Sequence, residues 1–264
     1  MKFSAVTSAA PSGISLFHGS FPAVFRAAKE AGFDCVQLTA KEADEIPAEE
    51  IRRQMDGTGL SVSAIATGRV YTVDGLSMGS SREENRTACL RRLRELADCG
   101  ASLGGAALVI GSVRGRWRDA ESREDYDRLF ETSLREISEY CEGIQVPVIL
   151  EAIDRFDADA YCDPGEALAL VERIQSPALH LYLDVMHLYN EGFDPAESIR
   201  RYGARSWQID LSGEDRLPPP QSERIDFPAV AAAIRDSGFD GPVSFEYASD
   251  APAEDLAYIK SLLK

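Results

Sequence analysis

Four acidic residues recur in the second half of the chain, each at the end of a short apolar run. Glu151 follows VPVIL, Asp184 follows HLYL, Asp210 follows WQI and Glu246 follows VSF, at intervals of 33, 26 and 36 residues. Such runs predict buried parallel strands, and the intervals are close to one strand–helix repeat of roughly 30 residues. Carboxylates at the same end of successive parallel strands are expected to face one shared mouth.

Grouped carboxylates need a positive partner, because two like charges about 5 Å apart repel by roughly 3 kcal/mol at an effective dielectric near 20. Such a group binds a cation or retains protons. Oxygen ligands favour a hard divalent ion, here Mn²⁺ or Mg²⁺. An ion pair with a loop Lys or Arg explains any single acid equally well, but it does not explain four in register. The spacing therefore predicts a divalent-metal site formed by all four acids.

Two polar residues accompany these acids at close spacing. His187 follows Asp184 by three residues, so its ring can turn back over the mouth as a ligand or as a hydrogen-bond donor to substrate. A satisfied loop histidine is the ordinary alternative. Gln208 precedes Asp210 by two residues, and the alternation of a strand places both side chains on one face, so Gln208 is a further candidate for binding substrate.

Two arginines follow predicted strands and are candidates for binding a substrate oxygen. Arg216 lies in the loop SGEDRLPPP after the Asp210 strand, and Arg114 lies in the loop GSVRGRWR after an earlier strand. A guanidinium can clamp oxygens with several N–H groups, although a solvated loop charge explains either residue on spacing alone. The loop containing Arg114 lacks the GK[ST] ending of a phosphate-binding P-loop.

Strand and helix signals alternate along the chain without a linker-like gap. The predicted strands cover residues 3–7, 34–38, 60–66, 106–110, 146–151, 180–184, 207–210 and 243–246. The predicted helices cover 21–32, 47–55, 82–99, 126–141, 164–174, 195–203, 227–238 and 252–263. Strict alternation favours a closed parallel barrel over a doubly wound sheet. We therefore expect an α/β fold with one (β/α)₈ barrel domain over 1–264, since such barrels typically have about 250 residues.

Composition narrows the class of partner. The formal net charge of −16 opposes binding to nucleic acid and to anionic membranes, and no apolar run is long enough to span a bilayer. The five cysteines are scattered and form no CxxC motif, which is typical of reduced thiols in a cytoplasmic protein. With no signal-peptide pattern at the N-terminus, we expect a cytoplasmic protein.

Several stretches resemble the sugar isomerase and epimerase superfamily with a xylose-isomerase-like TIM barrel. Within it the chain is most similar to ketose 3-epimerases and to 5-keto-L-gluconate epimerase-type proteins. The stretches are 64–78, 107–116, 148–156, 183–191, 209–219 and 243–248. The resemblance implies a divalent ion and a small sugar or sugar acid as substrate, and it allows a homo-oligomer.

The resemblance also implies roles for individual residues. Glu151 and Glu246 match the two catalytic glutamates, which also bind the metal, and Asp184 matches a further metal ligand. His187 and Arg216 match the groups that hold the substrate's oxygens. The implied reaction is removal and return of a proton beside a ketone through a cis-enediolate, with the two glutamates as acid and base.

The chain departs from the family pattern on the seventh barrel strand. The family usually has His-x-His there, whereas this chain has Gln208-Ile209-Asp210, with Asp210 six residues before Arg216 as the family spacing requires. Four carboxylates give the site one more negative charge than three and a histidine, which weakens the ion as a Lewis acid and disfavours softer ions.

Three functions follow from these observations. The first is a metal-dependent epimerase or isomerase of a ketose or keto-sugar acid. The second is a sugar-binding barrel that the change at Asp210 has impaired as a catalyst. The third, a DNA-repair endonuclease on the same fold, needs a histidine cluster and a basic groove, and this acidic chain has three histidines.

Overall fold

A computed structural model describes residues 1–264. The strands are β1 (Lys2–Ser8), β2 (Phe17–His18), β3 (Cys35–Thr39), β4 (Ser61–Ala66), β5 (Ala107–Ile110), β6 (Val148–Glu151), β7 (Leu179–Asp184), β8 (Ser206–Leu211) and β9 (Pro242–Phe245). The α-helices are α1 (Phe21–Ala31), α2 (Ala48–Thr58), α3 (Gly68–Thr72), α4 (Glu83–Ser102), α5 (Arg123–Gly143), α6 (Pro164–Ile174), α7 (Val185–Asn190), α8 (Pro195–Tyr202), α9 (Phe227–Asp236) and α10 (Pro252–Leu262). The short 3₁₀ helices are η1 (Ala43–Glu45), η2 (Ser112–Arg114), η3 (Trp117–Asp119), η4 (Gly203–Arg205), η5 (Glu214–Arg216) and η6 (Pro219–Gln221).

The strands form one sheet in the order β2-β1-β3-β4-β5-β6-β7-β8-β9, and β1 also pairs with β9. The sheet is therefore closed, and without the two-residue β2 it has eight strands. Strand β1 pairs in parallel with both β3 and β9. The predicted closed parallel barrel with flanking helices is confirmed.

Two short helices lie where the sequence predicted only loops. Helix α3 falls within 67–81, and α7 starts directly after β7. The reason for α7 is a capping interaction: Asp184 is its N-cap residue, and its carboxylate accepts a hydrogen bond from the backbone N–H of His187.

The chain divides into two compact units. Unit 1 comprises 1–38, 50–63 and 182–264, and unit 2 comprises 39–49 and 64–181. The expectation of one domain over 1–264 stays a prediction. No helix is both long and apolar enough to cross a membrane.

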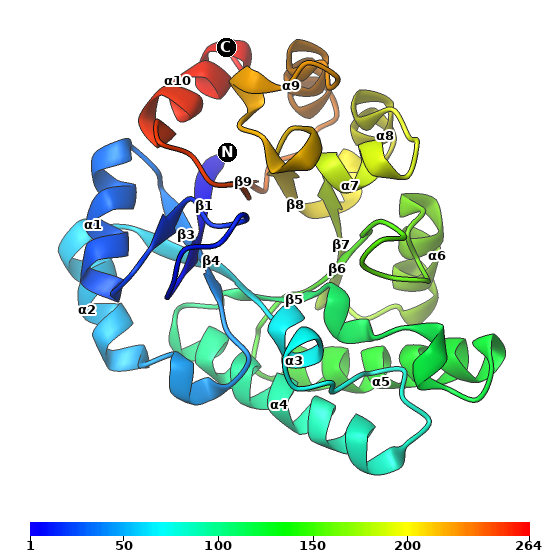
Figure 1. The fold of residues 1–264 in the computed structure, drawn as a ribbon. Coiled ribbons are helices and arrows are strands. Elements are labelled where there is room, and N and C mark those ends of the chain that lie inside the picture. Colours follow the sequence, from blue (N-terminus) through cyan, green and yellow to red (C-terminus); the bar gives the residue numbers. More distant parts are fainter. The chain divides into compact units, whose positions relative to one another are not determined.

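Unit 1 contains strands β1, β8 and β9 with helices α1, α9 and α10 outside them (Figure 1). Each of these helices has a proline in its first turn, where the missing N–H costs nothing. Gly32 ends α1 in the left-handed region at φ +89°, as its sequence position predicts. Edge-to-face contacts of Phe245 with Phe3 and Phe33 form part of the core.

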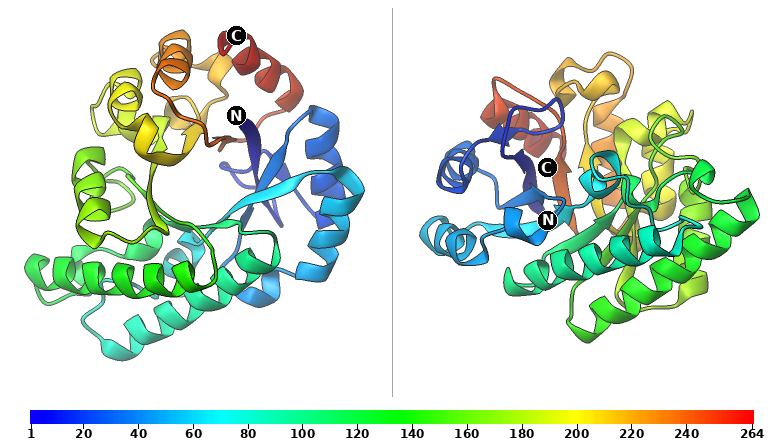
Figure 2. Two further views of the ribbon diagram at one scale, coloured as in Figure 1. Left: turned by 180° about the vertical axis from the view of Figure 1, so that it is seen from behind. Right: turned by 60° about the horizontal axis from the view of Figure 1, so that its bottom comes forward.

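Unit 2 contains strands β5 and β6 and the long helices α4 and α5, which run side by side (Figure 2). Every residue of β5 and β6 is buried, as continuous apolar runs require. One face of each long helix is apolar and buried, with Leu93 and Leu96 on α4 and Leu134 and Ile137 on α5. Helix α4 packs on β5, and α6 packs on β6, the strand that ends at Glu151.

Candidate metal centre

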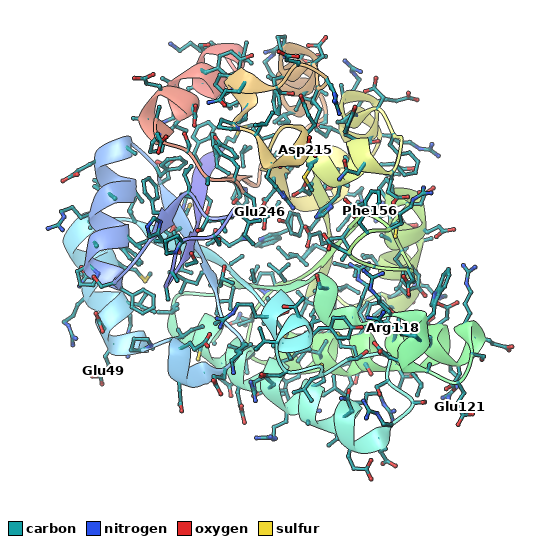
Figure 3. All side chains as sticks on the ribbon, in the orientation of Figure 1. Glu49, Arg118, Glu121, Phe156, Asp215 and Glu246 are labelled. Carbon is teal, nitrogen blue, oxygen red and sulfur yellow. The ribbon has the colours of Figure 1, made fainter.

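Three carboxylates meet at the carboxyl ends of β7, β8 and β9 in unit 1. Asp184 is the last residue of β7, Asp210 lies near the end of β8, and Glu246 immediately follows β9. One ligand atom from each lies within 4.8 Å of those of the other two. Asp184 and Asp210 are fully buried, and Figure 3 shows Glu246 beside the end of β9. Consecutive strands thus bring these three predicted ligands together.

Arg216 supplies positive charge to two of these acids. Its Nη1 lies 2.7 Å from Asp184 Oδ2 and 2.9 Å from Glu246 Oε2, and it also donates to Ser212 Oγ at 3.0 Å. Burial alone raises the pKa of Asp184, but the Arg216 guanidinium and the hydrogen bonds to the carboxylate hold that pKa below its ordinary value. Asp184 is therefore an anion at neutral pH.

His187 completes this hydrogen-bonded group from the third residue of α7. Its Nε2 lies 3.0 Å from Nη2 of Arg216. A guanidinium can only donate, so Nε2 is the acceptor in this contact. The side chain is buried, so its orientation is fixed by packing as well as by Arg216.

The loop after β8 aims Arg216 at the acids through an unusual backbone. Asp215 and Arg216 both have positive φ, at +56° and +60°. Each left-handed non-glycine residue costs roughly 1–2 kcal/mol, and such conformations persist where the surroundings enforce them. Here Gly213 N–H bonds Leu217 O at 2.7 Å, and the Glu214 carboxylate accepts from the Ser222 hydroxyl at 2.6 Å. Figure 3 shows Asp215 in this loop.

A buried pair of amides fixes Asp210. Gln208 Nε2 donates to Asp210 Oδ1 at 2.7 Å and to Gln37 Oε1 at 2.6 Å. Both protons of that amide are therefore used within the protein. The sequence placed Gln208 and Asp210 on one face, but it gave Gln37 no role. A polar residue inside the apolar strand run CVQLT was the signal that could have identified Gln37.

Glu151 stands at the end of β6 in unit 2. Its side chain lies against Gly111, where an added Cβ would come within 2.6 Å of Glu151 Oε2. The residue is 8 % exposed. Glycine at 111 thus leaves the space that the Glu151 carboxylate occupies. The role of Glu151 as a fourth ligand and as a catalytic group stays a prediction.

Arg114, the second predicted substrate-binding arginine, is fully buried in unit 2. Its guanidinium donates to backbone carbonyls alone. They belong to Gly111 at 3.0 Å, Ala160 at 3.0 Å, Ile110 at 3.1 Å, Tyr161 at 3.4 Å and Glu151. Burial lowers the pKa of Arg114, partly offset by nearby Tyr126 and Glu151. This geometry favours a structural role that ties the loop after β5 to the end of β6, and contact with substrate stays a prediction.

The donor set of unit 1 fits a hard divalent cation. Its carboxylate oxygens are close enough to share one ion, since such ions bind oxygen at about 2.0–2.6 Å. Arg216 adds one positive charge beside the cluster through its ion pairs with Asp184 and Glu246.

Comparison with known proteins identifies the class. Residues 25–262 match the model of the xylose isomerase-like TIM barrel family, and the chain belongs to that family. An L-ribulose 3-epimerase of Mesorhizobium japonicum is 25% identical over 232 residues, which cover 87% of this chain and 76% of that protein.

Solved structures agree on the fold. A D-psicose 3-epimerase of Clostridium cellulolyticum superposes with a TM-score of 0.85 at 15% identity over the full length of both chains. The 3-keto-D-glucoside 4-epimerase of E. coli superposes with a TM-score of 0.81 at 18% identity, covering 99% of this chain and 100% of the other. At these identities the likeness shows the fold alone.

Proposed function

We propose that this protein is a divalent-metal-dependent isomerase that epimerises a ketose or a keto-sugar acid. The observation that carries the proposal is the group of three carboxylates within 4.8 Å at the ends of β7, β8 and β9, in a member of a family with sugar epimerases among its relatives. The substrate is a small sugar rather than a nucleic acid, because the chain carries a net charge of −16. The scattered thiols suit a cytoplasmic setting.

We assign the ion to Asp184, Asp210 and Glu246, with Glu151 as the fourth ligand. Hard carboxylate oxygens select Mn²⁺ or Mg²⁺ over softer ions. A bound dication supplies Lewis-acid stabilisation of the negative charge that develops on the substrate's oxygens. Gln208 holds Asp210 in place for this role through its amide N–H groups, and its carbonyl oxygen is the part of the amide that we assign to substrate.

The two glutamates exchange the proton. One glutamate takes a proton from the carbon beside the ketone, and the electron pair of the broken C–H bond enters the cis-enediolate. The other glutamate then returns a proton to the opposite face of that carbon, which gives the epimer. Positioned acid–base groups of this kind contribute about 10²- to 10⁴-fold each.

His187 and Arg216 hold the substrate's oxygens. His187 lies 3.0 Å from Arg216, so the two side chains present their polar groups to the substrate together. Arg216 is already oriented by Asp184 and Glu246, so little side-chain freedom is lost when it meets substrate.

The test is incorporation of solvent deuterium beside the carbonyl of a panel of ketoses and keto-sugar acids. We expect exchange with added Mn²⁺ or Mg²⁺ and its loss in EDTA. Glu246→Gln should lower the exchange rate by about 10²- to 10⁴-fold while the thermal unfolding temperature stays near that of the parent. A Glu246→Gln variant that epimerises normally would remove the two-glutamate mechanism.

The alternative is a sugar-binding barrel without catalysis. The observation that favours it is Asp210 itself, because each further carboxylate weakens the Lewis acidity of the ion. Sugar binding without metal-dependent exchange on any substrate of the panel would favour this alternative.

A further inference from the structure

A second hollow in unit 1 lies beside the carboxylates and shares Arg216 with them. It is a pocket of about 440 Å³, bounded by the loops that follow β1, β8 and β9. These strands are neighbours, since β9 pairs with both β8 and β1. None of the three clustered carboxylates lines it. A group bound there therefore contacts Arg216 but not the three carboxylates.

The lining of the pocket combines apolar residues, among them Leu16, Leu217 and Pro218, with hydroxyl and amide groups. Ser12 and Ser15 line it, and Ser15 Oγ lies 2.9 Å from Ser12 Oγ and 2.7 Å from Ser8 Oγ. This connected row of hydroxyls is ordered before any ligand arrives. Gln221 from η6 adds an amide on the opposite wall. Hydroxyls and amides both donate and accept, which matches the hydroxyls of a sugar.

The charges of the lining oppose a phosphate group. Arg216 is committed to two carboxylates, and Asp250 adds a negative charge to the wall. Helix α10 begins beside the pocket. Its first turn already carries Glu254 and Asp255, whose negative charges compensate the positive end of the helix dipole. Besides Arg216, the lining offers a dianion one imidazole, that of the exposed His18, and no ammonium group.

The size of the pocket points to a whole further sugar ring. At about 440 Å³ it has room for a ring-sized group. It also lies within the range of about 300–1,000 Å³ that small-molecule sites occupy.

We propose that this pocket binds a neutral sugar unit joined to the reacting keto-sugar. The preferred substrate is then a glycoside or disaccharide that carries the ketone, rather than a free or phosphorylated ketose. This inference rests on the proposed epimerase function for its kinetic consequence, but the binding it describes can be measured alone.

The experiment compares three probes on the metal-loaded protein: a ketohexose, its phosphate ester, and a disaccharide with the ketone on one ring. We expect the kcat/KM for deuterium exchange to be at least tenfold higher for the disaccharide than for the other two. Ser12→Trp fills the pocket and should abolish that advantage without changing exchange on the ketohexose. Ile14→Trp, on the same loop but outside the lining, is the matched control and should keep it.

Equal rates for the free and linked sugars, or a preference for the phosphate ester, would overturn the inference. If no probe exchanges deuterium, the proposed function fails and calorimetry decides the inference separately. Binding of the disaccharide that Ser12→Trp weakens at least tenfold and Ile14→Trp leaves unchanged would then support the pocket. Equal binding to both variants, or no binding, would overturn it.

Discussion

Arg216 and Arg114 have opposite kinds of partner, although the sequence assigned both to substrate. Arg216 donates a hydrogen bond to Asp184, forms an ion pair with Glu246 and contacts His187 in unit 1. Arg114 bonds five main-chain carbonyls in unit 2 and is entirely buried. The first arginine therefore balances charge, whereas the second holds backbone segments together.

The difference teaches how to separate functional from structural arginines. Because the partners of Arg216 are carboxylates, its contribution to the free energy of folding depends on any other cation that these acids bind. The hydrogen-bond partners of Arg114 are neutral carbonyls, so its contribution to stability depends on a bound ion only through the nearby charge of Glu151. Added metal should therefore distinguish the two residues, and the following changes test that distinction from the largest expected effect to the smallest.

Arg216→Gln should lower the free energy of unfolding in EDTA by about 3–5 kcal/mol, because it leaves buried carboxylates without their counter-charge. Saturating Mn²⁺ should restore more stability to this variant than it adds to the parent, since the ion replaces the missing positive charge. Urea unfolding with and without Mn²⁺ measures both values. If Mn²⁺ stabilised the variant and the parent equally, the proposed difference between Arg216 and Arg114 would be wrong.

Arg114→Met should lower the free energy of unfolding by about 3 kcal/mol, because several buried carbonyls lose their donor. Here Mn²⁺ should add no more stability than it adds to the parent. The same urea titration provides the measurement. Recovery of this variant by the ion would contradict a purely structural role for Arg114.

Gln208→Leu should weaken Mn²⁺ binding by about 10- to 100-fold, the usual cost of removing a group that orients a metal ligand. Isothermal titration calorimetry measures the loss. Gln37→Leu removes only the outer amide and should have a smaller effect of the same sign. Unchanged affinity in Gln208→Leu would mean that packing alone positions Asp210.

Arg91→Gln gives the lower bound of the series. Arg91 pairs with Glu95 one turn away on α4 at 3.2 Å, and its side chain is 67 % exposed. Exposed pairs of this kind contribute about 0.3–0.5 kcal/mol. The free energy of unfolding of Arg91→Gln should therefore stay close to that of the parent. A loss as large as that of Arg114→Met would show that removing any arginine explains the other results.

The barrel and the ends of its last strands could be predicted from the sequence because each depends on a local pattern. An apolar run that stops at an acid marks Asp184 and Glu246 without knowledge of their neighbours. The carbonyl partners of Arg114 could not be predicted, since they come from residues up to 47 positions away. Helix α7 was missed because its single turn and a half has no hydrophobic period to detect.

The backbone conformation of the loop after β8 also could not be predicted from the sequence. Positive φ at Asp215 and Arg216 contradicts the ordinary preference of both residues. Surrounding contacts enforce that conformation. Gln37 was missed for a different reason, because its partner Gln208 lies 171 residues away.

Gly111 has a consequence for engineering this protein toward new sugars. A methyl group at that position meets only the flexible end of Glu151, so an alanine variant would fold and survive a stability screen. It would nevertheless shift the one carboxylate that the proposed chemistry needs from β6. Libraries selected on expression or thermostability would accumulate such variants unnoticed, so position 111 should be held constant from the start.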